Sequence, residues 1–326
     1  MSVERGSPLV SIVLPTYRRP HLFPHAIRSV LAQSYPHWEL IVVDDNSPDH
    51  TPEVVASFTD PRIRAVRNDP NLKLPRTLNR GFALASGELL TWTSDDNLYH
   101  PQAIEKMVAR LQRGDCDFVY ADYWLFSELD AAGAPLDIQH DRLPDRLQLE
   151  RGNHIGACFM YSRALAEAVG EYDPELFLVE DYDYFIRAAR QFRFAHIAEP
   201  LYYFKRDDAT LYISRYCEVK ASDLLVRYRN GLLDGAGVVE AVVELLLRNI
   251  AGLKNPLLRG GHALLRTRSF RLTNWHAKLT SHHLRRQLHG PVLALLDGYR
   301  QQQRSFGESR QALVALINAL GAVSYQ

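Results

Sequence analysis

Apolar positions follow two different periods along the first 122 residues. Short β-branched and apolar runs, bounded by Gly, Pro, Asp or Asn, indicate buried strands, and longer stretches with apolar residues three and four positions apart indicate amphipathic helices. The expected strands are 10–14, 40–43, 63–66, 89–93 and 118–121, and the expected helices are 21–33, one beginning at Thr51, 75–85 (closed by Gly87) and 101–113. Strands and helices that alternate at this rhythm predict a parallel sheet with right-handed crossovers.

After residue 122 the alternation loosens. Residues 136–152 are polar and charged, which predicts a loop with a short helix and a candidate flexible lid. Further on, the pattern predicts a strand at 157–161, helices at 163–169 and 179–191, an extended segment at 194–204, and helices from Tyr216 onward. The helix at 238–250 is amphipathic, because its charged residues recur every four positions. We therefore expect an α/β domain over 1–215 and a helical region over 216–326.

Three of the expected strands end in polar residues that carry chemistry. These ends are Pro15-Thr16-Tyr17-Arg18-Arg19, Asp44-Asp45-Asn46-Ser47 and Ser94-Asp95-Asp96-Asn97. All three belong at the sheet edge where open α/β sheets bind ligands. Adjacent carboxylates need a cation or hydrogen-bond donors to stay ionised, and hard oxygen ligands suit Mg²⁺ or Mn²⁺, which bridge to phosphates. In the alternative interpretation each segment is an ordinary turn, with Asp96 or Asn97 capping the next helix.

In their order and spacing, these segments resemble a known family. The stretches VSIVLPTY at 10–17, ELIVVDDNS at 39–47, ASGE at 85–88 and SDDN at 94–97 resemble the family 2 nucleotide-sugar glycosyltransferases, of the inverting, spore-coat-polysaccharide-synthesis type. The resemblance covers about residues 8–205. It implies a GT-A fold, a Rossmann-like, mostly parallel sheet flanked by helices, with a helical C-terminal region. Residues 1–122 would form the nucleotide-binding half and 123–215 the acceptor-binding half.

The resemblance also implies roles for individual residues in donor binding. Asp96 would hold a Mn²⁺ or Mg²⁺ ion that bridges the diphosphate. Ser94 stands where the family has the first Asp of its Asp-x-Asp site, so this site has one charge fewer. The nucleotide, with uracil as the expected base, would contact Pro15, Thr16, Tyr17, Arg19, Asp44, Asp45, Lys73, Arg76 and Asp95.

Glu180 and Asp181, at the start of a predicted helix, resemble the Glu-Asp motif of the family. Asp181 would then be the general base, whereas in the alternative both acids only complement the helix dipole. His154, Gly156 and Glu180 would shape the pocket for the donor sugar and the acceptor, although a loop histidine bonded to backbone is an equally good interpretation of His154.

The function implied by the resemblance is transfer of a sugar, with inversion, from a UDP-sugar to a hydroxyl of a glycan or lipid-linked acceptor in polysaccharide biosynthesis. The Ser94 substitution favours one alternative, a catalytically inactive nucleotide-sugar-binding or scaffold subunit. A nucleotidyltransferase would need a Gly-rich loop after the first strand, and residues 15–19 contain no glycine.

Charge is unevenly spread along a chain of zero formal net charge. The window 245–296 has nine Lys or Arg, five His and no Asp or Glu. The rest of the chain therefore has 29 Lys or Arg and all 38 Asp or Glu. This basic window, interleaved with leucines, indicates a solvated face, a homo-oligomer contact or docking on an anionic membrane surface. Metal binding by its histidines is disfavoured by the neighbouring arginines, and no nucleic-acid-binding module is recognisable.

The remaining composition bears on the compartment. Cys116, Cys158 and Cys217 form neither a disulfide framework nor a zinc pattern, which favours a reducing cytosol. The first residues lack a signal-peptide layout, and no apolar run reaches the ~18 residues of a membrane span. We expect a cytoplasmic protein, peripheral at the inner face of the cell membrane.

Overall fold

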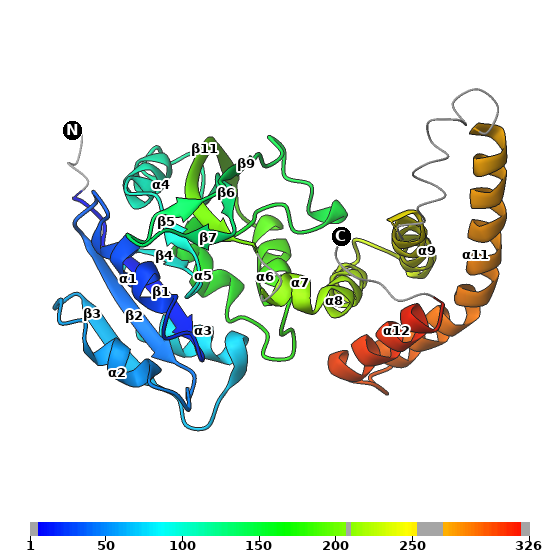
Figure 1. Cartoon of the computed structure of the whole chain (residues 1–326), viewed down its shortest axis with the longest axis horizontal. Helices are drawn as coiled ribbons and strands as arrows, with labels where there is room; N and C mark the ends of the chain where they lie inside the picture. Colours follow the sequence, from blue (N-terminus) through cyan, green and yellow to red (C-terminus); the bar gives the residue numbers. More distant parts are fainter. Residues whose placement is uncertain (1–5, 207–209, 253–269, 321–326) are drawn as a thin grey trace. The chain divides into compact units, whose positions relative to one another are not determined.

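The computed structural model describes residues 6–206, 210–252 and 270–320, and the chain divides into two compact units, 1–207 and 208–326 (Figure 1). The first unit is built on a nine-stranded sheet in the order β3-β2-β1-β4-β10-β6-β11-β5, with β9 beside β6. These strands are β1 (Val10–Thr16), β2 (Trp38–Asp44), β3 (Ile63–Arg67), β4 (Leu89–Trp92), β5 (Leu98–Tyr99), β6 (Phe118–Phe126), β9 (Gln139–Asp141), β10 (Phe159–Ser162) and β11 (Phe194–Lys205). A small separate hairpin joins β7 (Glu128–Leu129) to β8 (Pro135–Leu136).

The sheet is mostly parallel, as the sequence predicts. β1 pairs in parallel with β2 and β4, and β2 with β3, so their carboxyl ends meet at one edge. β10 runs antiparallel to both β4 and β6, which places β6 and β11 in the same direction as β1. The sequence does not reveal that β10 is reversed, and it gives no sign of the short strands β5, β7, β8 and β9.

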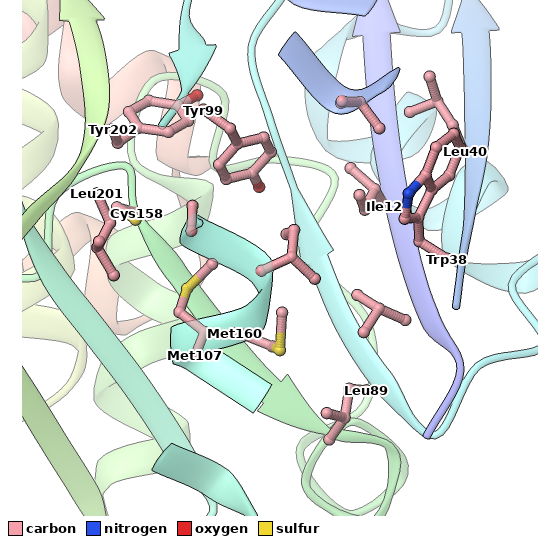
Figure 2. Packing of buried hydrophobic residues seen from close by; sticks show 14 of the residues in the cluster. Ile12, Trp38, Leu40, Leu89, Tyr99, Met107, Cys158, Met160, Leu201 and Tyr202 are labelled. Atoms are coloured by element: carbon pink, nitrogen blue, oxygen red, sulfur yellow. The ribbon is translucent and has the colours of Figure 1, made fainter. Parts of the chain in front are cut away.

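Helices cover both faces of this sheet. One face packs on α1 (Phe23–Leu31), α2 (Thr51–Ala56) and α4 (Ala103–Leu111), and Figure 2 shows part of this core, where Met107 lies near Met160 and Leu201. The other face carries α3 (Lys73–Ala83), α5 (Arg163–Val169) and α6 (Glu180–Ala189). Alternate residues of β1 and β2 face the first layer because side chains in a strand point to opposite sides, whereas β11 has irregularities that interrupt this alternation.

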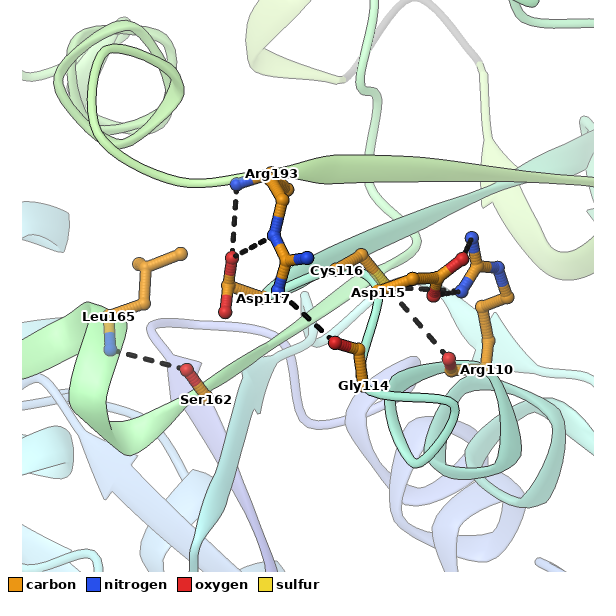
Figure 3. Close-up of polar contacts among 8 residues, drawn as sticks. All are labelled: Arg110, Gly114, Asp115, Cys116, Asp117, Ser162, Leu165 and Arg193. Atoms are coloured by element: carbon orange, nitrogen blue, oxygen red, sulfur yellow. Dashed lines mark hydrogen bonds and ion pairs between the residues drawn. The ribbon is translucent and has the colours of Figure 1, made fainter.

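Polar contacts fix the loops at the amino-terminal edge of the strands, opposite the candidate site (Figure 3). The Ser162 hydroxyl accepts the Leu165 N–H at 3.2 Å and caps α5. The Arg193 guanidinium donates to Asp117 at 3.4 Å and to the Gly114 carbonyl at 3.2 Å, so the starts of β6 and β11 are tied together. The scaffold beneath the site is thus fastened independently of the site's own residues.

The second unit is helical, as predicted. It contains α7 (Leu211–Ser214), α8 (Tyr216–Arg229), α9 (Gly235–Gly252), α11 (Phe270–Arg300) and α12 (Phe306–Leu320). Leu284 and Leu288 of α11 are buried, whereas Arg286 is exposed and Arg285 pairs with Glu240 of α9 at 2.6 Å. Much of the basic window 245–296 lies outside the described residues, so its docking on a membrane stays a prediction. Across the described ranges, no helix combines the length and the apolar character needed to cross a membrane.

Gly87 has a role different from the helix stop that the sequence suggests. α3 already ends at Ala83, and a Cβ on Gly87 would lie 2.6 Å from the Leu9 carbonyl oxygen and 2.7 Å from the Ser11 nitrogen. The Gly87 N–H also donates to the Ser11 hydroxyl at 2.8 Å. A glycine is therefore needed because the backbone entering β4 passes directly against β1.

We predict that Gly87→Ala lowers the free energy of unfolding of the first unit by about 1–3 kcal/mol, because backbone atoms must move to admit the methyl group. Trp38, Trp92 and Trp124 lie in this unit and Trp275 in the other, so tryptophan fluorescence in a urea titration reports mainly on the first unit. The control is Glu88→Ala, at an exposed neighbouring position, with an expected change within about 0.5 kcal/mol. An equal effect of the two substitutions would contradict the close-approach explanation.

Candidate active site

The ends of β1 and β4 are joined by a buried hydrogen bond. Thr16 Oγ1 donates to Asp95 Oδ2 at 2.8 Å, and the Tyr17 N–H approaches the same oxygen at 3.4 Å. Asp95 is therefore committed to holding the loop after β1 in place. That loop presents Tyr17, a residue that is 41% exposed and whose ring centroid lies 5.2 Å from the Arg18 guanidinium.

Asp96 is the neighbouring carboxylate and faces a different set of groups. Its side chain is 12% exposed, and Arg19 Nη1 lies 3.9 Å from its Oδ2. Burial raises the pKa of Asp96, while the charge of Arg19 and a hydrogen bond from Ser94 oppose that rise. Burial and the charge of Asp96 also raise the pKa of Asp95. Two buried adjacent carboxylates with one nearby guanidinium form a site that favours a further cation.

Two adjacent aspartates at the end of β2, Asp44 and Asp45, have different surroundings. Asp45 accepts the Asn68 side-chain amide at 2.7 Å and the backbone N–H groups of Leu72 and Lys73 at 2.7 and 3.0 Å. Asp44 accepts the Ser47 N–H at 3.0 Å through Oδ1. Within the described part of the chain its Oδ2 has no hydrogen-bond partner, although Arg67 Nη1 lies 3.3 Å away.

Asp45 thus shapes the loop that leads into α3. Lys73, with φ of 68°, and Arg76 are both exposed in the first turn of this helix. Asn68 is fully buried and links Asp45 to the Thr77 hydroxyl at 3.0 Å. Because the N–H groups of Leu72 and Lys73 already donate to Asp45, the two cationic side chains make this surface suited to an anion such as a diphosphate.

Asp181 lies half-buried at the start of α6. Its Oδ2 accepts the Asn153 side-chain amide at 2.9 Å, and its Oδ1 accepts the Tyr182 N–H at 2.7 Å. Burial raises the pKa of Asp181 to about 6, although both hydrogen bonds act in the opposite direction. A carboxylate with this pKa is ionised at neutral pH and is more basic than an exposed one.

Glu180 lies deeper than a pocket residue. It is buried, and its Oε2 accepts the N–H of Leu178, which has a φ of 89° that is rare for a residue with a side chain. Burial, and secondly the charge of Asp181, raise the pKa of Glu180. Its carboxyl group supports the turn before α6 and adds no free charge at the surface.

Aromatic packing sets the position of α6 on the sheet. The Phe185 ring meets Phe159 of β10 edge-on, with centroids 5.0 Å apart, and Phe159 meets Trp92 of β4 at 6.1 Å. Trp92 is three residues before Asp95. The helix that carries Asp181 is therefore fastened to the same sheet, next to the strand that leads to Asp95 and Asp96.

The predicted lid region is tied to the sheet at one end. Asp122 of β6 lies 3.0 Å from His140 Nε2 and 2.7 Å from His196 Nε2, and it accepts the Leu143 N–H at 2.9 Å. Further on, the Tyr182 hydroxyl donates to the Leu149 carbonyl. The predicted short helix is present as η1 (Leu149–Arg151), whereas the mobility of the segment stays a prediction.

Two of the predicted pocket residues follow this segment. Gly156 has φ of 72°, and a Cβ there would lie 2.5 Å from the Tyr123 ring, so only a glycine fits. His154 is half-buried on the same loop. After the extended segment at 194–204 the sequence also offers Asp207 or Asp208 as a metal ligand, and both lie outside the described residues.

Sequence reasoning named Thr16 as a nucleotide contact, but it missed the hydrogen bonds that support the carboxylates of the site. Asn153 holds Asp181, Asn68 holds Asp45, and Thr16 holds Asp95, but none of these pairings is visible as a local pattern because the partners are 28, 23 and 79 positions apart. Only Thr16 could have been suspected from the sequence, because it ends a strand that is expected to be buried.

Comparisons with known proteins agree with this architecture. The model of the family described as "Glycosyl transferase family 2" matches residues 11–170. WcaA of Escherichia coli K12, named provisionally as a colanic acid biosynthesis glycosyl transferase, is 34% identical over 188 residues, which are 56% of this chain and 67% of that protein. The chain belongs to glycosyltransferase family 2, which confirms the resemblance.

A further relative is WfgD of Escherichia coli, named UDP-Glc:alpha-D-GlcNAc-diphosphoundecaprenol beta-1,3-glucosyltransferase. It is 30% identical over 138 residues, which are 41% of this chain and 54% of that protein, so the chain spans about half the length of this relative.

Two solved structures share the fold. Staphylococcus aureus TarS 1–349 in complex with UDP has a TM-score of 0.54 and 16% identity, covering 96% of this chain and 90% of that one. Mannosyltransferase PcManGT of Pyrobaculum calidifontis, in complex with GDP-Man and Mn²⁺, has a TM-score of 0.56 and 16% identity, covering 85% of this chain and 86% of that one. The predicted GT-A fold is thereby confirmed.

We predict that Asp45→Asn lowers the free energy of unfolding of the first unit by about 2–4 kcal/mol, because an amide NH₂ would face groups that donate hydrogen bonds. Tryptophan fluorescence in urea measures the change. Asp69→Asn is the matched control, since Asp69 is exposed in the same loop and loses the same charge. If Asp45→Asn is as stable as the control, Asp45 does not hold this loop.

Proposed function

We propose that this chain transfers a sugar from a nucleoside-diphosphate donor, a UDP-sugar, to a hydroxyl of an acceptor, with inversion at the anomeric carbon. The observation that carries the proposal is Asp181, a half-buried carboxylate with a raised pKa that Asn153 orients through a hydrogen bond. Asp181 lies at the start of α6, which packs on β10, the neighbour of β4 in the sheet. This arrangement disfavours the alternative of an inactive subunit, because a carboxylate kept only for the helix dipole needs no orienting amide.

The donor would lie across the carboxyl ends of β1, β2 and β4. Tyr17 offers an exposed ring for stacking on the base, with Pro15 and Thr16 beneath it. Asp44 Oδ2 is buried and ion-paired with Arg67, but it has no hydrogen-bond partner among the described residues, so we propose Asp44, ahead of Asp45, as the acceptor for a base N–H. Lys73 and Arg76 would face the diphosphate from the start of α3.

The residues at β4 fit a divalent cation that is shared with the donor. Asp96 supplies hard oxygens, and among the described residues no group of three or more His, Cys, Asp or Glu could complete a cation site by itself. Mg²⁺ and Mn²⁺ are commonly held by one or two carboxylates plus substrate phosphates, which suits this arrangement. When bound, such an ion would neutralise charge that develops on the leaving diphosphate.

The acceptor hydroxyl would approach Asp181. A hydroxyl is a weak nucleophile at neutral pH, and a carboxylate within hydrogen-bond reach takes its proton as attack proceeds. Asn153 and the Tyr182 N–H each hold one oxygen of Asp181, so the carboxylate has a fixed orientation and its remaining lone pairs are available to the hydroxyl. Attack from the face opposite the diphosphate gives inversion.

Polysaccharide biosynthesis, which the names of the relatives support, is the proposed setting. A lipid-linked acceptor is proposed by analogy with the printed name of WfgD. A cytoplasmic location beside the inner face of the membrane remains part of the proposal.

We predict that Asp96→Ala removes the contribution of Mn²⁺ to UDP binding. The wild type should bind UDP more tightly with Mn²⁺ than with EDTA, and the variant should bind it equally in both conditions, at least tenfold more weakly than wild type with Mn²⁺. The fold should be retained, because Asp96 lies in the turn after β4 and outside the hydrophobic core. Calorimetric titration measures both conditions, and an unchanged Mn²⁺ effect in the variant would exclude Asp96 as the ligand.

We predict that Asp181→Asn lowers turnover by about 10²-fold or more while donor affinity stays near the wild-type value. The amide keeps the shape but cannot accept a proton. The base form is lost as the pH falls through the pKa of about 6, so the wild-type rate should fall below pH 6 and level off above it. The residual rate of the variant should not show this fall below pH 6.

Turnover is measured as release of UDP from a panel of UDP-sugars with candidate acceptors. Glu175→Gln, an exposed change on the segment before α6, should behave as wild type. An Asp181→Asn protein with full activity and the same pH profile would mean that Asp181 is only a helix-start residue.

A further inference from the structure

The carboxylates at the end of β4 are balanced by two cationic side chains of different character. Arg19 and Lys205 both act on Asp96. Lys205 is buried, its Nζ donates to the Ser127 carbonyl at 2.7 Å, and its backbone N–H donates to Asn97 at 2.8 Å. This lysine is therefore part of the scaffold that joins β11 to the turn after β4.

Arg19 is held differently. Its carbonyl oxygen accepts the N–H groups of Leu22 and Phe23 at 3.2 and 3.0 Å, so its backbone is fixed just ahead of α1. Its side chain is 27% exposed, and its guanidinium approaches Asp96 only to 3.9 Å, beyond hydrogen-bond distance. Because the backbone of Arg19 is fixed and its guanidinium forms no hydrogen bond with Asp96, the side chain can change partners without a change in the fold.

We propose that Arg19 is an exchangeable counter-ion for Asp96. It neutralises Asp96 before the donor arrives, and it turns to the diphosphate when a metal-bound nucleoside diphosphate occupies the site. The inference rests on the proposed function. The charge of Arg19 also acts on Asp95, but Asp95 is more deeply buried and Thr16 and Tyr17 hold its Oδ2, so Asp96 is the carboxylate at which a ligand can replace Arg19.

Two physical arguments favour this exchange. Adjacent buried carboxylates are unfavourable without a nearby cation, so a site that waits empty between turnovers needs a substitute for the metal ion. A guanidinium presents a planar pair of donors that matches a phosphate as well as a carboxylate, so one side chain serves both states.

The exchange also couples the two ligands. A metal ion without nucleotide must displace Arg19 and leave the guanidinium unpaired beside it. With the diphosphate present, the same guanidinium gains a partner. Mn²⁺ and the nucleotide should therefore each strengthen binding of the other, through a coupling that is reciprocal by thermodynamic necessity.

The test is direct binding to full-length Arg19→Gln, with Mn²⁺ alone and with UDP or GDP in the presence of Mn²⁺. Free Mn²⁺ is followed by electron paramagnetic resonance and nucleotide binding by calorimetry. The proposal predicts effects of opposite sign. Mn²⁺ alone should bind about two- to fivefold more tightly, because a partly exposed ion pair no longer competes with it. The nucleotide with Mn²⁺ should bind about tenfold more weakly, because a charge-assisted contact is lost.

Two further variants make the result specific. Arg19→Lys keeps the charge but loses the planar pair of donors. This variant should have the wild-type affinity for Mn²⁺ alone and should bind the nucleotide more weakly than the wild type does. Arg18→Gln removes the same charge at the neighbouring exposed position, where the guanidinium lies over Tyr17, and should leave Mn²⁺ affinity within about twofold of the wild-type value.

The outcomes separate this inference from the proposed function. If the wild type binds neither UDP nor GDP with Mn²⁺, the proposed function fails and the role of Arg19 fails with it. If the wild type binds a nucleotide but Arg19→Gln leaves Mn²⁺ affinity unchanged, or weakens both ligands, only the counter-ion role is overturned. Tighter Mn²⁺ binding together with weaker nucleotide binding supports it.

Discussion

The candidate site depends on the hydrogen bond between Thr16 and Asp95, which joins the ends of two parallel strands in the interior. The bond is 2.8 Å long and buried, and each partner follows a strand whose register is set by the pairing of β1 with β4. Because an unpaired buried carboxylate is strongly unfavourable, this contact fixes the loop after β1 relative to the turn after β4. The positions of Tyr17, Arg19 and Asp96 all follow from it.

Carboxylates in this site divide into those that build it and those that remain available. Asp95, through Oδ2, and Asp45, through both oxygens, accept hydrogen bonds from neighbouring O–H and N–H groups, and Glu180 supports the turn before α6. Asp96 and Asp181 keep partial exposure and lone pairs. The more exposed carboxylates are the ones suited to chemistry, since a ligand or a proton can reach them without breaking the structure.

Aromatic packing brings the second half of the site to the first. The rings of Trp92, Phe159 and Phe185 connect β4, β10 and α6, so the helix with Asp181 cannot shift without disturbing the core. The segment between β9 and Asn153 is tied to Asp122 and then supplies the amide that orients Asp181. Rigid elements therefore carry the proposed base, and a tethered loop adjusts its orientation.

The sequence by itself determined the alternation of strands and helices, the parallel sheet, the family, the strand ends that lead to Asp44 and Asp96, and the helix start that carries Asp181. It could do so because hydrophobic period and turn residues are local signals. Only the tertiary structure decided that β10 is reversed, that Gly87 serves a close approach to β1, and that Asp45 and Glu180 act as supports. These distinctions depend on pairings between residues distant along the chain and on burial, which sets the protonation and the free lone pairs of each carboxylate.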